Sequence, residues 1–71
     1  MPFYEVVFKP ETAFAPEVVE ADAAVVLPGE GMLVFEPIVV DGKYSRPAPI
    51  PLRFLLRVTE EGTGRVIYDR G

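Results

Sequence analysis

Proline and glycine divide this chain into short apolar runs, and this division most limits what the chain can fold into. Eight prolines and six glycines fall within 71 residues. Several runs between them alternate apolar and polar residues, the period-two pattern of a strand with one buried face. The sequence therefore predicts an all-β domain of about five to six short, mainly antiparallel strands, arranged as a barrel or a sandwich.

The length of the chain leaves a narrow margin for stability. Its 71 residues suffice for a single domain, residues 1–71, and a domain of this size buries only about 60% of its unfolded surface. The chain contains no cysteine and no histidine, so disulfides are excluded and the commonest catalytic base and metal ligand is missing. Small domains without disulfides or metals often gain stability by oligomerising, and we expect the same here.

Composition also bears on source and location. The chain lacks asparagine and glutamine and has eight prolines, which fits a thermophilic bacterial source. It also has five arginines against two lysines, a bias that GC-rich coding produces equally well. No apolar run reaches the ~18 residues of a membrane-spanning helix. The first ten residues, MPFYEVVFKP, lack the pattern of a signal peptide. We therefore expect a soluble, cytoplasmic protein without a membrane partner.

The first half of the chain predicts two strands. Residues 3–9 form the first, followed by a proline-bracketed loop at 10–16 in which Phe14 is expected to fold back as a lid on the core. Residues 17–27 contain enough alanine and acid for a helix, but their alternation and four valines favour one strand, with room for a bulge.

The run MLVFEPIVV, residues 32–40, follows a predicted tight turn at 28–31 and is apolar on both faces. Met32, Val34, Ile38 and Val40 are expected on one side and Leu33, Phe35 and Val39 on the other. Pro37 removes a backbone donor and places that point at an edge or a bulge. Since one face fills the core, the other must lie under a loop, close a barrel or meet a second chain. The loop at 10–16 is short and would cover only part of this face, so the pattern predicts a homodimer or higher oligomer. The predicted self-association residues are Met32, Leu33, Val34, Phe35, Ile38, Val39 and Val40.

The second half begins with Asp41–Gly42, a type I′ hairpin signal. Prolines at 47, 49 and 51 then alternate, which has the wrong spacing for a PxxP ligand and favours a stiff connector at a sheet edge. Residues 51–60 predict the clearest strand, with Leu52, Phe54, Leu56 and Val58 inward, and a turn at 61–64 returns the chain through 65–69. The predicted core is Tyr4, Val6, Phe8, Val25, Leu33, Phe35, Phe54, Leu56, Val58 and Val66.

An alternative function is suggested by the basic and aromatic residues. Lys43, Tyr44, Arg53, Arg57, Arg65 and Tyr68 would form a nucleic-acid-binding face if the fold brought them together. The net charge of −4 argues against it, because nonspecific binding depends on neutralising phosphates. We favour a structural interpretation, in which the outward-facing Arg53 and Arg57 pair across strands with the strand that carries Asp69.

Catalytic and metal-binding signals are weak. Glu17, Glu20 and Asp22 form the one carboxylate cluster, without a calcium-loop motif, and are expected to be solvated. PGEG and EGTG do not match phosphate-binding glycine motifs. The sequence thus predicts no cofactor, no metal and no enzyme, but a non-catalytic β module that binds itself or another protein.

Overall fold

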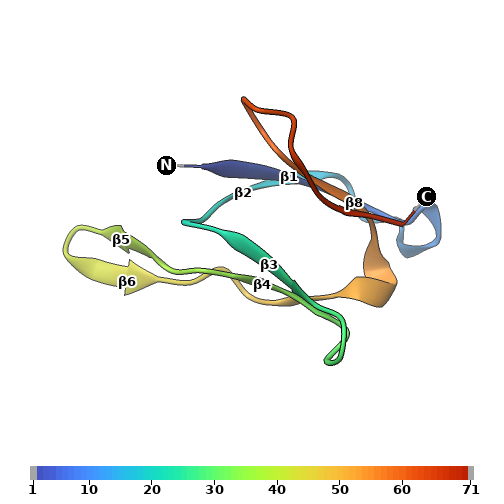
Figure 1. Ribbon diagram of the computed structural model, residues 1–71, viewed down its shortest axis with the longest axis horizontal. Helices are drawn as coiled ribbons and strands as arrows, with labels where there is room; N and C mark the ends of the chain where they lie inside the picture. Colours follow the sequence, from blue (N-terminus) through green and yellow to red (C-terminus); the bar gives the residue numbers. More distant parts are fainter. Residues whose placement is uncertain (1, 71) are drawn as a thin grey trace.

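The computed structural model describes residues 2–70, and its regular structure consists of short strands and two 3₁₀ turns (Figure 1). About half of the described residues lie in strands, and every strand pair is antiparallel. The elements are β1 (Phe3–Phe8), η1 (Pro10–Thr12), β2 (Glu17–Glu20), β3 (Ala24–Leu27), β4 (Met32–Phe35), β5 (Ile38–Val40), β6 (Lys43–Ser45), β7 (Ile50–Pro51), η2 (Leu52–Phe54), β8 (Leu55–Glu60) and β9 (Val66–Asp69). The prediction of an all-β, antiparallel fold is confirmed.

The strands form three sheets that do not close into a barrel. One sheet has the order β2-β1-β8-β9, a second has the order β3-β4-β7, and β5 pairs with β6 alone. In Figure 1 the four-stranded sheet lies above the three-stranded sheet, and the β5–β6 hairpin extends from one end. Of the two architectures predicted, the sandwich-like one fits.

The core lies between the two larger sheets. Its fully buried large side chains come in pairs from β1, β4 and β8: Tyr4 and Val6, Leu33 and Phe35, and Leu55 and Val58. The rings of Tyr4 and Phe35 are 6.3 Å apart and inclined at 51°, which joins the two layers. Each such side chain contributes about 1.5–3 kcal/mol on burial. Five of the ten predicted core residues, Tyr4, Val6, Leu33, Phe35 and Val58, are therefore confirmed as buried.

Residues 17–27 form two strands rather than the predicted single one. β2 belongs to the four-stranded sheet and β3 to the other, and the chain crosses between them at the fully buried Ala21. The Ala21 N–H donates to the Pro2 carbonyl at 3.3 Å. Val19 packs on the core before this crossing and Val26 after it. The alternation of inward-facing and outward-facing side chains therefore shifts by one residue at the crossing. Val25 is consequently 39% exposed, and its predicted place in the core is wrong.

Residues 52–58 also depart from the predicted strand. Leu52–Phe54 forms the turn η2, and β8 begins only at Leu55. In the pairing with β1, Val7 lies opposite Arg57 and Phe8 opposite Leu55, which leaves Leu56 as the extra residue of a β-bulge. The bulge turns Leu55 into the core and leaves Leu56 half-buried, as are Phe54 and Phe8. The predictions that Phe54 and Leu56 are core residues are wrong for this reason.

The β8–β9 hairpin contains a second irregularity. Thr59 lies opposite Val66 and Val58 opposite Tyr68, so Ile67 is the unpaired residue. Ile67 and Tyr68 pack against the core, whereas Val66 is 54% exposed. The predicted burial of Val66 is therefore also wrong.

The predicted strand 32–40 is interrupted at Pro37, where the sequence anticipated an edge or a bulge. β4 ends at Phe35 and β5 begins at Ile38. Ile38 is buried, as are Leu33 and Phe35, so the prediction that Ile38 shares a side with Met32 and Val34 is wrong. The turn that follows is confirmed: Asp41 and Gly42 have φ values of 52° and 75°, the two positive angles that a type I′ turn requires.

The neighbouring leucines of β8 provide a matched test of the bulge. Replacing Leu55 with alanine is expected to lower the free energy of unfolding by about 2–5 kcal/mol, because the side chain is fully enclosed. Leu56→Ala removes the same atoms from a half-buried site and is expected to cost less than half as much. Urea unfolding followed by circular dichroism measures both. A larger loss for Leu56→Ala would contradict the bulge and support the simple alternation.

Candidate functional site

An apolar groove lies between the loop that follows η1 and the segment that contains β7 and η2. It has a volume of about 470 Å³, and its walls include Phe8, Phe14, Phe54, Pro49 and Pro51. Phe14 meets Phe8 edge-on, with 5.4 Å between ring centroids. Phe14 meets Phe54 in the same manner at 6.3 Å. Edge-to-face rings are a favourable arrangement, so the three phenylalanines form one aromatic wall.

The loop that follows β1 positions Phe14 in this wall. Ala13 adopts a left-handed conformation with φ of 60°, and its N–H donates to the Pro10 carbonyl at 3.1 Å. The Thr12 hydroxyl donates to the Lys9 carbonyl at 2.8 Å and accepts the Phe14 N–H at 3.2 Å. Phe14 is 57% exposed, so the prediction of a lid on the core is wrong: the ring borders a surface groove.

The alternating prolines form the facing wall. β7 is an edge strand that pairs only with β4, with Ile50 opposite Leu33 and Pro51 opposite Met32. The Leu52 N–H donates to the Gly31 carbonyl at 2.8 Å. This placement confirms the predicted position at a sheet edge, where proline is tolerated because it lacks the N–H that a central strand would need.

Two charged side chains are associated with the groove. Glu17 is the one ionisable residue in its lining, at the start of β2. The Arg53 guanidinium stacks over the ring of Phe54, 4.8 Å from its centroid, within the distance of a cation–π contact. The groove is thus a hydrocarbon surface with one carboxylate in its lining and one guanidinium stacked on the ring of Phe54.

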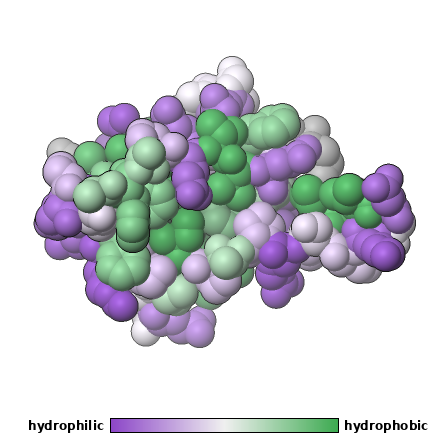
Figure 2. Space-filling model, turned by 180° about the vertical axis from the view of Figure 1, so that it is seen from behind, coloured by the Kyte–Doolittle hydropathy of each residue, from purple (hydrophilic) through white to green (hydrophobic). Residues whose placement is uncertain are grey.

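The β5–β6 hairpin, residues 38–45 and hereafter the arm, is the second candidate surface. It extends from the body in Figure 1, and Figure 2 shows strongly apolar side chains on it beside hydrophilic ones. Val39 is 60% exposed and Tyr44 is 82% exposed. These two residues lie directly opposite each other across the strands, so they share one face of the arm.

The predicted self-association residues occupy three different environments. Leu33, Phe35 and Ile38 are buried within the chain, whereas Met32 and Val34 are half-buried. Val39 and Val40 are exposed. Within this set, the surface available to a second chain is therefore concentrated on the arm.

The six residues of the predicted nucleic-acid face come from separate parts of the structure. Lys43 and Tyr44 belong to the arm, Arg53 to η2, and Arg57 and Tyr68 to the four-stranded sheet. Arg65 pairs with Glu60 at 3.2 Å. Arg57 lies opposite Asp69 in the β8–β9 register, which is the placement expected for cross-strand pairing. The fold does not gather these residues into one basic surface.

The acidic residues are also separated. Glu17 enters the groove lining and Glu20 lies at the other end of β2, opposite Phe3, while Asp22 follows the strand. Within residues 2–70 there is no group of three potential metal-ligating side chains of the Asp, Glu, His or Cys type.

Sequence reasoning did not find the groove. Its signals were present in the phenylalanine between two prolines at 10–16 and in the alternating prolines at 47–51. Neither signal shows that these segments lie face to face, because they are more than thirty residues apart in the chain.

Comparisons with protein-family models, with curated proteins and with solved structures find no match to this chain. The described part of the chain has no helix with the length and apolar character needed to cross a bilayer. The two surfaces must therefore be interpreted from their own chemistry.

A titration with nucleic acid tests the alternative function. We expect binding of a fluorescently labelled single-stranded oligonucleotide to be weak at 50 mM salt and undetectable at 200 mM. The net charge is −4 and the cations are dispersed, so few phosphates would be neutralised at once. Fluorescence anisotropy measures the affinity. Tight binding with a steep salt dependence would instead support the nucleic-acid-binding function.

Proposed function

We propose that this protein is a non-catalytic β interaction module that self-associates through the arm. The observation that carries the proposal is the cross-strand pair Val39 and Tyr44, two large side chains that are 60% and 82% exposed on the arm. An aromatic ring with a polar hydroxyl at its tip is enriched at protein interfaces.

The energetics of a small hairpin support this proposal. An isolated two-stranded hairpin is marginally stable in water, and β5 and β6 pair only with each other. At the base of the hairpin Ile38 is buried. A second chain that covered Val39 and Tyr44 would stabilise the arm and remove apolar surface from water.

Two features support a binding role rather than a catalytic one. The chain has no histidine and no cysteine, and Glu17 is the one ionisable group in the groove. Acid–base catalysis commonly uses two titratable groups, one as the general acid and one as the general base, and the groove lining offers a single carboxylate. The absence of cysteine suits a reducing compartment, and we include a cytoplasmic location in the proposal.

Light scattering after size-exclusion chromatography tests self-association. We expect the wild-type protein to run as a dimer or larger species at high micromolar concentration. The double variant Val39→Thr, Tyr44→Thr is expected to be monomeric with an unchanged circular dichroism spectrum, because threonine retains β propensity and removes apolar contact area.

The matched control is Val66→Thr, which alters a valine of similar exposure on β9. It should leave the oligomeric state unchanged. A strictly monomeric wild-type protein would refute the proposal, and equal loss of association in Val66→Thr would place the interface elsewhere.

A further inference from the structure

The arm and the groove lie toward opposite ends of the molecule. The body and arm together span 38 Å along the longest axis. In Figure 1 the arm extends from one end, while the loop after β1 and η2 lie at the other, beside the C-terminus. The arm therefore does not fill the groove of its own chain, and any contact between the two surfaces joins different molecules.

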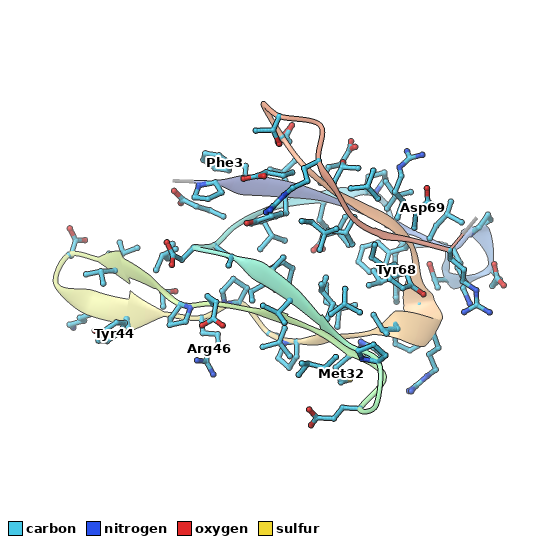
Figure 3. The ribbon with its side chains drawn as sticks, viewed as in Figure 1. Phe3, Met32, Tyr44, Arg46, Tyr68 and Asp69 are labelled. Carbon is cyan, nitrogen blue, oxygen red and sulfur yellow. The ribbon has the colours of Figure 1, made fainter. Side chains whose placement is uncertain are left out.

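One face of the arm combines apolar surface with one positive charge. Val39 and Tyr44 are cross-strand neighbours on this face. Arg46 follows Tyr44 by two residues, directly after β6, and Figure 3 shows both side chains on the same side of the ribbon. Arg46 is exposed. We call Val39, Tyr44 and Arg46 the arm face.

The groove has the complementary composition. Its wall of Phe8, Phe14 and Phe54 offers ring edges and faces to an incoming aromatic side chain. Its volume of about 470 Å³ falls within the ~300–1,000 Å³ of pockets that enclose small ligands. Glu17, the one charged residue in its lining, is the counterpart of Arg46.

The overall charge distribution acts in the same direction. Residues 38–46 contain Asp41, Lys43 and Arg46 and carry a net charge of +1, so the rest of a chain of net charge −4 carries −5. The arm itself, residues 38–45, is neutral, so the positive charge is that of Arg46 directly after it, and Arg46 is attracted to the acidic remainder of a second copy.

We propose that the arm face of one copy docks in the aromatic groove of a second copy, with Val39 and Tyr44 against the phenylalanine wall and Arg46 paired with Glu17. This inference rests on the proposed self-association and assigns the surface that receives the arm. Because two different patches meet, the contact is heterologous: it closes by reciprocal exchange in a two-fold dimer or a ring, or it grows into an open chain.

Mixing two defective variants tests the pairing. The arm variant is Val39→Thr, Tyr44→Thr, and the groove variant is Phe14→Ser, which alters an exposed ring outside the core. Each alone is expected to bind itself at least about tenfold more weakly than wild type, since ring contacts and apolar area are lost. A mixture of the two is expected to form a complex, because the groove of one and the arm of the other are intact. Sedimentation velocity measures all three samples.

A charge exchange provides an independent test that leaves every ring in place. Glu17→Arg and Arg46→Glu should each weaken association, because each sets like charges together in the contact. The double variant Glu17→Arg, Arg46→Glu restores opposite charges and should recover most of the wild-type affinity. This test also covers the case in which Phe14→Ser fails to fold.

The outcomes separate the inference from the proposed function. If the arm variant is monomeric but Phe14→Ser and Glu17→Arg associate like wild type, the arm pairs with another surface; self-association then stands and the groove assignment is overturned. A monomeric wild-type protein overturns both. Failure of the mixture to form a complex, without rescue by the charge exchange, also overturns the groove assignment.

Discussion

The antiparallel pairing of β1 with β8 is the interaction on which the rest of the structure depends. These strands are the two central members of the four-stranded sheet, and they contribute Tyr4, Val6, Leu55 and Val58 to the core. The two strands are about fifty residues apart in the chain. Bringing them together costs loop-closure entropy, and this cost is offset only when the core has assembled. In a domain with so small a core, loss of this pairing would leave neither sheet with a buried face.

The same pairing creates the groove. Beyond the bulge at Leu56, the Lys9 N–H donates to the Phe54 carbonyl at 2.9 Å, which continues the contact between the two chain segments past the regular ladder. Phe8 and Phe54 are thereby held near each other, and the loop ordered by Thr12 adds Phe14 between them. An irregularity between the two central strands of the sheet thus positions the aromatic wall, since a bulge changes the direction in which side chains point.

The arm and the groove give this small domain two apolar surfaces at its two ends. Large side chains that remain in water contribute nothing to a core, and a 71-residue chain has few to spare. Contact between copies would bury this apolar surface, and the burial would stabilise the domain without disulfides or metals. Under this proposal folding and assembly are thermodynamically linked, so the apparent stability would rise with protein concentration.

The sequence alone determined that the chain forms short antiparallel strands, with a turn at Asp41–Gly42 and the alternating prolines at an edge, from period-two patterns, φ preferences and missing N–H donors. The crossing at Ala21 and the turn η2 did not follow from these patterns. Only the tertiary structure decided which residues on those strands face inward. At Ala21, Pro37, Leu56 and Ile67 the alternation slips by one residue, and each slip exchanges the buried and exposed sides that follow. The groove was equally inaccessible to pattern analysis, because Phe14 and Pro49 line it from segments that are distant in the sequence. Local propensity acts within a few residues, whereas strand register and the meeting of distant loops are set by packing across the whole core.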